Sequence, residues 1–251
     1  MGKELFKNIP SKVGDLVKDV RNGRIGLPDL QRPFVWRDNK VRELFDSMLK
    51  GYPIGYIMLW ESPVDYESKK STIGDNSKTY EEPKELVIDG QQRLTSLYAV
   101  MKGKKVINSK FDEKSIVISY CPLQNKFEVG YQATKNDPEW IYNISDLFTS
   151  TNTFKFIGDF IKKLGDYRST KGSELTDEEQ GLIADRINGV VNLKSHTLPV
   201  FDIKSTAEEE DVSEIFVRVN SGGVSLKQND FILTLLSLYW DDGRREIEQF
   251  S

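Results

Sequence analysis

The amino-acid sequence predicts an α+β fold, and three observations indicate it. Hydrophobic residues recur at helical spacing in several stretches, most extensively between residues 140 and 195. Short apolar runs bounded by glycine, proline or aspartate lie between those stretches, as is typical of β-strands. The 251 residues are 38% hydrophobic, which is enough to bury the core of one large domain or of a domain with a sub-domain.

The first 60 residues alternate between predicted helices and extended segments. A helix is expected over residues 11–22, where one apolar face is formed by Val13, Leu16, Val17 and Val20. Residues 25–27 are expected to be extended before Pro28. Asp38 is expected to cap a second helix that ends at Gly51, with an apolar face of Val41, Leu44, Phe45, Met48 and Leu49. Residues 54–60 then have the pattern of a strand.

The middle of the chain begins with a polar stretch. Residues 61–84 contain few apolar anchors, which predicts a mobile loop or insertion. Residues 85–88 form a predicted buried strand that ends at Asp89-Gly90, and a helix with an apolar face of Leu94, Leu97, Tyr98 and Met101 follows. Two further strands, near 115–120 and 126–131, are expected to pair as a hairpin.

The last third is predicted to be mainly helical. Two apolar stripes lie between residues 140 and 195: Phe154, Ile157, Phe160, Ile161 and Leu164, then Leu182, Ile183, Ile187 and Val190. A strand over 197–203 precedes a helix that carries Val212, Ile215, Phe216 and Val219. That helix is expected to end at Ser221-Gly-Gly223, and Ser225 with Gln228 forms a capping box for a last helix over 227–239.

Composition excludes several classes of function. The net charge of -4 argues against a free-standing DNA-binding protein, which usually carries a positive surplus against phosphate. One cysteine, Cys121, permits no internal disulfide and fits a reducing cytoplasm. A cysteine–histidine zinc site is impossible with His196 as the lone histidine, and a structural role suits that residue better than a catalytic one. No apolar run has the length of a membrane span.

The strongest local motif is Leu86-Val-Ile-Asp-Gly-Gln-Gln-Arg-Leu94, where a strand runs directly into a helix. The first turn of a helix presents backbone N–H groups and partial positive charge, which suit a phosphate. Arg93 could add a bidentate contact to phosphate oxygens, and Asp89 could hold a metal ion or orient a water. Gln91 and Gln92 could hold a base, a ribose or an attacking water.

A purely structural interpretation of the same motif stays open. Asp89 with Gln92 also has the spacing of a helix N-cap with its capping-box partner, and Gly90 would then only fit the turn. The motif matches neither the dinucleotide fingerprint nor the P-loop pattern.

Two further segments carry polar residues at turns. Leu27-Pro-Asp-Leu-Gln-Arg-Pro-Phe-Val-Trp36 places Gln31 and Arg32 beside aromatic residues, an arrangement that can hold a base and a phosphate. The alternative is that the aromatic residues are core anchors and Arg32 is a surface charge. Phe216-Val-Arg-Val-Asn-Ser-Gly-Gly223 ends a predicted helix with Arg218 and Asn220, and its alternative is an ordinary helix end with a glycine exit.

In this order, the three motifs resemble the N-terminal domain family of GmrSD restriction endonucleases. The spacer Lys50-Gly-Tyr-Pro-Ile-Gly-Tyr-Ile-Met-Leu-Trp60 is also similar to that family's pattern, and the resemblance covers residues 9 to 240. It implies a nucleotide-handling core similar to ParB and sulfiredoxin, with an added mainly helical region. It also implies that the Asp-Gly-Gln-Gln-Arg turn binds and hydrolyses a nucleoside triphosphate with Mg²⁺, the base being undetermined.

The resemblance assigns roles residue by residue. Asp89, Gln92 and Arg93 are the implied catalytic residues, with Asp89 also the metal ligand. The implied nucleotide-binding residues are Gln31, Arg32, Gly90, Gln91, Arg218 and Asn220. The implied partners are modified double-stranded DNA and a histidine-metal finger nuclease domain, either in the same polypeptide or as a separate subunit. A nuclease finger needs a histidine among clustered ligands, so we do not expect it within these residues.

These inferences combine into one expected organisation and one leading function. Residues 1–135 are expected to form the ParB-like core, residues 136–195 a helical insertion, and residues 196–251 the return to the core, truncated before an effector domain. The leading function is a nucleoside triphosphatase that regulates a DNA endonuclease in phage defence. The alternatives are a ParB-like nuclease in its own right and a non-catalytic module that binds DNA or protein.

Overall fold

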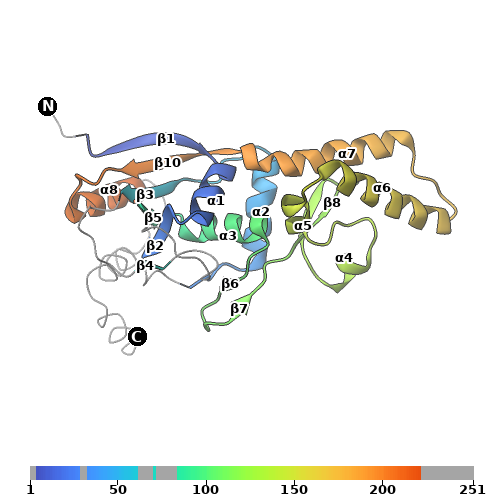
Figure 1. Ribbon diagram of the computed structural model, residues 1–251, viewed down its shortest axis with the longest axis horizontal. Coiled ribbons are helices and arrows are strands. Elements are labelled where there is room, and N and C mark those ends of the chain that lie inside the picture. The colour runs from blue at the N-terminus through green and yellow to red at the C-terminus, as the bar shows by residue number, and fades with distance from the viewer. Residues whose placement is uncertain (1–3, 29–32, 62–69, 72–83, 222–251) are drawn as a thin grey trace. The chain divides into compact units, whose positions relative to one another are not determined.

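The computed structural model describes residues 4–28, 33–61, 70–71 and 84–221, and these residues form a mixed α+β structure, as predicted (Figure 1). They divide into two compact units. The first unit combines residues 1–33, 55–94 and 197–251, and the second combines residues 34–54 and 95–196. No helix in the described part of the chain is both long enough and apolar enough to cross a membrane.

The first unit is built on a mixed sheet whose described strands lie in the order β1-β10-β3-β5-β2-β4. The strand bounds are β1 Phe6–Lys12, β2 Ile25–Pro28, β3 Ile57–Glu61, β4 Lys70–Ser71, β5 Glu85–Asp89 and β10 Thr197–Ile203. β10 is parallel to β3, and β2 is parallel to β5. The pairs β1–β10, β3–β5 and β2–β4 are antiparallel. β3 and β5 run in opposite directions, so the start of β3 lies beside the end of β5.

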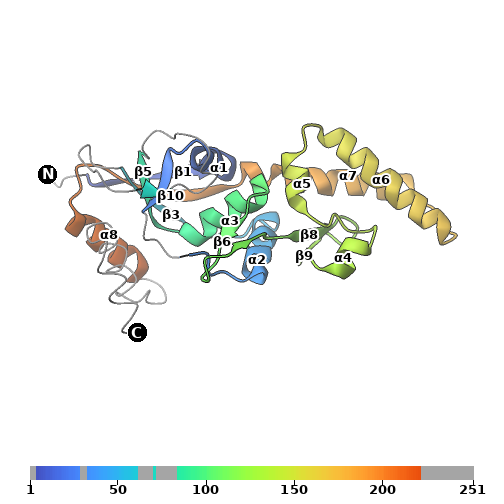
Figure 2. The ribbon, with the colours of Figure 1, turned by 60° about the horizontal axis from the view of Figure 1, so that its bottom comes forward.

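Apolar side chains cover this sheet on both faces. Helix α8 (Glu209–Ser221) packs Val212 and Phe216 against Met58, Trp60 and other apolar residues on one face. Alternate residues of the same strands, Ile57, Leu59 and Val87, are buried as well. Helix α1 (Val13–Arg21) buries the predicted face of Val13, Leu16, Val17 and Val20, and Figure 2 shows it on the side of the sheet opposite α8. Two buried faces explain why β3 and β5 are apolar at consecutive positions.

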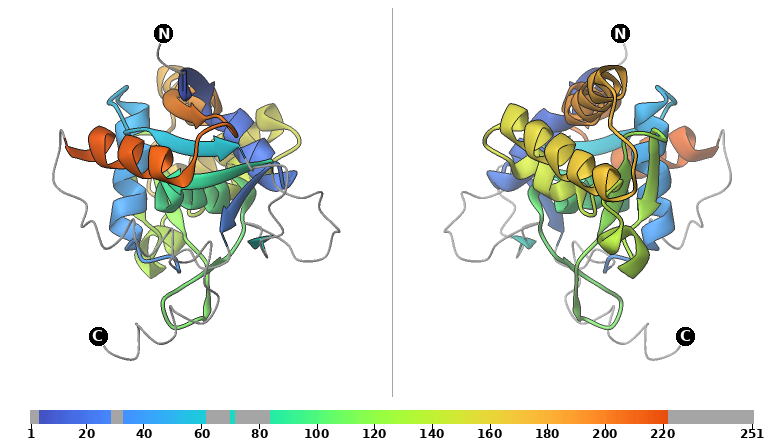
Figure 3. Two further views of the ribbon diagram at one scale, coloured as in Figure 1. Left: turned by 90° about the vertical axis from the view of Figure 1, so that its left-hand side faces the viewer. Right: turned by 90° about the vertical axis from the view of Figure 1, so that its right-hand side faces the viewer.

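The second unit is mainly helical, as predicted for its residues 140–195. Its helices are α2 Asp38–Leu49, α4 Gln132–Asn136, α5 Ile144–Thr149, α6 Thr153–Thr170 and α7 Asp177–Val191, followed by the 3-10 turn η1 Asn192–Ser195. α6 and α7 lie side by side (Figure 3). Two small hairpins complete it, formed by β6 Val106–Ile107 with β7 Glu113–Lys114 and by β8 Ile118–Cys121 with β9 Lys126–Val129. α3 (Gln91–Lys102) starts in the first unit and continues into the second.

Three details differ from the sequence predictions. β1 was not predicted, because it is an edge strand whose side chains are almost all exposed and therefore show no apolar alternation. Asp38 is the first residue of α2 rather than its cap, and its carboxylate accepts a hydrogen bond from Lys114 at 2.7 Å. Phe154 and Leu182 do not belong to the buried stripes of α6 and α7, since their side chains are 87% and 40% exposed.

Some predictions fall on residues outside the described part of the chain. They concern Gln31 and Arg32, most of the expected mobile loop 61–84, the capping box of Ser225 with Gln228, and the last helix over 227–239. They stay predictions.

Candidate functional site

The turn between β5 and α3 has the strand-to-helix geometry that the sequence predicted. Gly90 has φ +85°, and its carbonyl accepts the backbone N–H of Leu94 at 2.9 Å. That bond is the first of the helix, so Gly90 is the N-cap of α3. Asp89 lies one residue too early for this position, and its Oδ1 instead accepts the N–H of Gly90 at 2.7 Å. The capping-box interpretation of Asp89 with Gln92 is therefore wrong.

Gly90 is required by close packing as well as by its backbone conformation. A Cβ atom at this position would lie 2.6 Å from Ile57 Cδ1 and 2.9 Å from the carbonyl oxygen of Tyr56. L-residues with side chains rarely adopt this φ, and both neighbours belong to the segment that enters β3. The turn thus passes directly against the start of β3.

Arg93 links the first turn of α3 to that same segment. Its Nη1 donates a hydrogen bond to the carbonyl oxygen of Tyr56. Gly55 has φ +90°, and a Cβ there would lie 2.6 Å from Arg93 Nη2, so the guanidinium rests against bare backbone. Burial lowers the pKa of Arg93, while the charge of Asp89 and the nearby Tyr56 oppose that shift. The guanidinium is therefore a largely buried cation beside one carboxylate.

Tyr56 connects the Asp-Gly-Gln-Gln-Arg motif at the start of α3 with the motif that begins at Phe216 on α8. Its hydroxyl donates to Oδ1 of Asn220 at 2.8 Å, and Asn220 Nδ2 donates to the carbonyl oxygen of Phe216 at 2.9 Å. Burial is the main cause that raises the pKa of Tyr56, and the hydrogen bonding and charge of Asp89 raise it further. The Tyr56 ring packs edge-on against Phe201 on β10, with centroids 5.3 Å apart. Motifs more than 120 residues apart therefore meet at one tyrosine.

Sequence reasoning did not select Gly55 or Tyr56 as site residues. The available signal was the segment Lys50–Trp60, which was noted only as a family-like spacer. The part of this segment that leads into β3 contains Gly51, Gly55 and Tyr56 but no charged side chain. Its residue types therefore gave no reason to predict a binding or catalytic role. Only the pairing of β3 with β5 places Tyr56 opposite the Asp89 turn.

The remaining predicted residues occupy different positions. Gln92 Nε2 donates to the carbonyl oxygen of Pro33 at 3.2 Å, so α3 contacts the backbone that directly follows the Gln31-Arg32 motif. Gln91 and Gln92 are both partly exposed. The Arg218 guanidinium forms an ion pair with Glu214 Oε1 at 2.5 Å on the exposed surface of α8. The structure thus unites Asp89, Gly90, Arg93 and Asn220.

The electrostatics of this turn suit a ligand that brings its own negative charge. Asp89 supplies the carboxylate, whereas Arg93 and the N-terminus of α3 supply positive charge. Among the described residues, no group of three histidine, cysteine or acidic side chains is arranged to hold a metal ion. Mg²⁺ commonly uses one or two carboxylates together with substrate phosphates, so Asp89 fits that mode of binding.

Two residues with reactive side chains lie outside the site. Cys121 is buried in β8, and burial raises the pKa of its thiol, which makes the thiolate scarce. His196 follows η1, and burial lowers the pKa of its imidazole.

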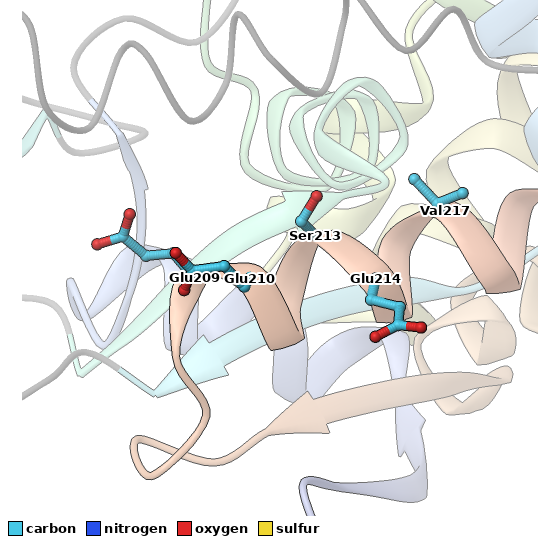
Figure 4. Close-up of a pocket in the computed structure, with 5 residues that line it drawn as sticks. All are labelled: Glu209, Glu210, Ser213, Glu214 and Val217. Carbon is cyan, nitrogen blue, oxygen red and sulfur yellow. The ribbon is translucent and has the colours of Figure 1, made fainter.

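A hollow lies on the surface of α8, next to Arg218, whose guanidinium pairs with Glu214. Glu209, Glu210, Ser213, Glu214 and Val217 line it, and Figure 4 shows all five on this one helix. Burial, followed by the neighbouring Glu210, raises the pKa of Glu209. Three carboxylates would repel a phosphate, so this hollow does not suit a nucleotide.

Comparison with known proteins agrees with these motifs. The family described as "GmrSD restriction endonuclease, N-terminal domain" matches residues 13–237. An uncharacterized protein of Methanocaldococcus jannaschii is 26% identical over 249 residues, which cover 87% of this chain. The match covers 40% of that relative, so this chain spans less than half of the relative's length.

Proposed function

Since this chain belongs to the GmrSD restriction endonuclease N-terminal domain family, we propose that it binds a nucleoside triphosphate and hydrolyses it to regulate DNA restriction. The site is the turn from β5 into α3. The whole system would restrict foreign DNA that carries modified bases or a modified backbone, as part of phage defence in the cytoplasm.

The observation that carries this proposal is the convergence of Asp89, Arg93, Tyr56 and Asn220 at the start of α3. α3 is 12 residues long, so its N-terminus carries a substantial partial positive charge. Gly90 has no side chain with which to cap that end, and the first turn contains no acidic residue. A phosphate group would complement both features, because helix N-termini bind anions through backbone N–H groups.

Each residue has a specific proposed role. Asp89 orients the attacking water and holds Mg²⁺ together with the phosphates, and the bound ion supplies charge neutralisation on the phosphate oxygens. Arg93 contacts phosphate through the guanidinium nitrogens that Tyr56 does not use. Gln92 positions the water, and Gly90 lets the phosphate approach the backbone. Further nucleotide contacts come from Gln31, Arg32, Gln91, Arg218 and Asn220.

Regulation, rather than cutting, is the proposed task of these residues. The chain carries a net charge of -4 and one histidine, so a histidine-metal finger nuclease would have to lie outside it, in the same polypeptide or in another subunit. Nucleotide state at the Asp89 turn would then be transmitted through Tyr56 to Asn220 on α8, since these side chains are in contact.

Thermal unfolding tests this function directly. Addition of ATP, GTP, CTP or UTP with Mg²⁺ should raise the melting temperature for at least one nucleotide, because a ligand that binds only the folded state stabilises it. Asp89→Asn should keep most of that stabilisation and reduce turnover. The function is wrong if calorimetry detects no heat with any of the four nucleotides. Robust DNA nicking by the pure chain, lost in Asp89→Ala, would instead support a nuclease.

A further inference from the structure

The hairpin of β6 and β7 in the second unit presents an unusual aromatic residue at its tip. Phe111 is 81% exposed, and its backbone adopts φ +62°. This left-handed conformation is uncommon for residues other than glycine, asparagine and aspartate. A large aromatic side chain therefore stands in solvent at a position where asparagine or glycine would be favoured on backbone grounds.

The tip is held in place by a network of local hydrogen bonds. Asn108 Oδ1 accepts the backbone N–H of Lys110 at 2.8 Å and of Asp112 at 3.0 Å. The backbone carbonyl oxygen of Asn108 accepts the N–H of Phe111 at 2.9 Å. The backbone N–H of Asn108 donates to the carbonyl oxygen of Asp112 at 3.0 Å. Four bonds to one residue fix the direction in which the loop presents Phe111.

Folding alone gives no reason for this arrangement. Left-handed backbone is unfavourable for a residue with a side chain, and the Phe111 ring recovers little burial in return. Phe154 provides a contrast within the same unit: it is 87% exposed but occupies an ordinary helical position in α6. Only Phe111 of these two combines exposure with a strained backbone.

The charge around the tip differs in sign from the charge of the chain. Residues 102–114 contain five lysines and two acidic residues, a surplus of three positive charges, whereas the whole chain carries -4. Lys105 pairs with Glu113 and Lys114 pairs with Asp38, each at 2.7 Å. Lys110, adjacent to Phe111, forms no ion pair within the part of the chain that the structure describes. The tip thus offers a cation beside an exposed ring.

We propose that this hairpin is a duplex-DNA contact in which Phe111 wedges against a base step and Lys110 contacts a neighbouring phosphate. Phenylalanine is one of the apolar residues that proteins insert between base steps, and lysine neutralises the flanking backbone. The proposal rests on the role in DNA restriction that is proposed above. It adds that a surface outside the Asp89 turn contacts the DNA.

The experiment compares three variants of the full 251-residue chain. Binding to a 30-base-pair duplex at low salt is measured by fluorescence anisotropy, and a 2-aminopurine in that duplex reports unstacking. Phe111→Gly should weaken binding about tenfold, by analogy with the loss of one aromatic stacking contact, and should abolish the 2-aminopurine increase. Lys110→Gln should reduce the slope of log affinity against log salt by about one. Phe154→Ala, the matched control, should leave both signals unchanged.

The stability of Phe111→Gly separates loss of function from loss of fold. Glycine accepts the left-handed conformation, so this variant should melt at the parent temperature or above it while binding DNA less tightly. Unchanged affinity in Phe111→Gly, or no DNA binding by the parent, overturns the inference. Concentration-dependent self-association that Phe111→Gly abolishes would assign the tip to protein contact and also overturn it. Nucleotide stabilisation at the Asp89 turn is measured independently, so the proposed function can succeed or fail separately.

Discussion

Two helices in this protein begin in opposite ways, and the difference bears on where a ligand would bind. α7 begins with a complete capping box: Thr176 accepts the N–H of Glu179 at 3.2 Å, and Glu179 accepts the N–H of Thr176 at 3.0 Å. Its first turn is also acidic. α3 has Gly90 as its N-cap and carries Arg93 in its first turn. One helix neutralises its positive end with side chains of its cap and first turn, whereas the other has a cation in its first turn and the nearby carboxylate, Asp89, before the cap.

This contrast shows that similar sequence spacing does not ensure similar capping. Asp89-x-x-Gln92 and Thr176-x-x-Glu179 both fit the capping-box pattern. At α3 the strand continues through Asp89, and the left-handed Gly90 takes the cap position. At α7 no strand precedes the helix, so Thr176 is free to adopt the extended backbone of an N-cap. Four predictions test the comparison, from the largest expected effect to the smallest.

Gly90→Ala should destabilise the fold most. The new Cβ would lie 2.6 Å from Ile57 Cδ1 in a left-handed backbone, so we expect a loss of about 3 kcal/mol from strain and overpacking together. Gly172→Ala is the control: its φ is +75° and nothing lies within 4 Å of the new atom, which predicts only about 1–2 kcal/mol. Urea unfolding measures both. Equal losses would show that the close approach of the turn to β3 has no energetic consequence.

Arg93→Ala should weaken nucleotide binding about tenfold or more, through the loss of charge-assisted hydrogen bonds worth roughly 1.5–3 kcal/mol. Arg93→Lys keeps the charge but not the planar fork, so it should recover only part of the affinity. Isothermal calorimetry gives the dissociation constants, and Arg168→Ala, whose guanidinium pairs with Glu139 in the second unit, serves as the control. If Arg93→Ala binds nucleotide as tightly as the parent, Arg93 has a structural role through its hydrogen bond to Tyr56 and does not bind phosphate.

Thr176→Ala should lower the free energy of unfolding by about 1 kcal/mol, because it removes the N-cap hydrogen bond of α7. Nucleotide binding should stay unchanged. Asp89→Asn should show the reverse pattern, with near-parent stability and reduced turnover, since the N-cap of α3 is Gly90. Melting curves and phosphate release distinguish the two. A loss of stability in Asp89→Asn as large as that in Thr176→Ala would return Asp89 to a structural role.

Glu85→Gln, at the other end of β5 from Asp89, should give the smallest effect and a definite pH dependence. Burial, more than any other cause, raises the pKa of Glu85, against the opposing effect of Arg24. The folded state therefore favours the protonated form, and its stabilising contribution is lost as pH rises above the ordinary value of 4.5. Glutamine should raise the melting temperature at pH 7 and have no effect at pH 3.

Glu4→Gln provides the control of opposite sign. The hydrogen bond from Lys204 lowers the pKa of Glu4, so the stabilising contribution of its charged form is present at neutral pH and is lost on acidification. Glutamine there should lower the melting temperature slightly at pH 7. If both variants shift the melting temperature in the same direction at pH 7, burial is not the main cause of the pKa shift of Glu85.

Much of the fold was predictable because most elements bury one continuous apolar face. α1 buries the predicted residues, and the hairpin of β8 and β9 overlaps the predicted segments. β10 has the predicted bounds of residues 197–203. Membership of the family was predictable from the order of three motifs and is confirmed by the match over residues 13–237. The likeness to ParB and sulfiredoxin stays a prediction.

The sequence by itself determined the α+β class, the family and the strand-to-helix turn at Asp89, because each depends on local pattern and on residue type. Tertiary structure decided which distant groups meet there. Tyr56 reaches Asn220, 164 positions away, because β3 pairs with β5 and α8 packs on the same sheet. The cap of α3 was decided in the same way: the approach of β3 allows only glycine at position 90, which moves the helix start past Asp89. Long-range pairing and steric exclusion leave no periodicity in a sequence, so only the folded chain shows them.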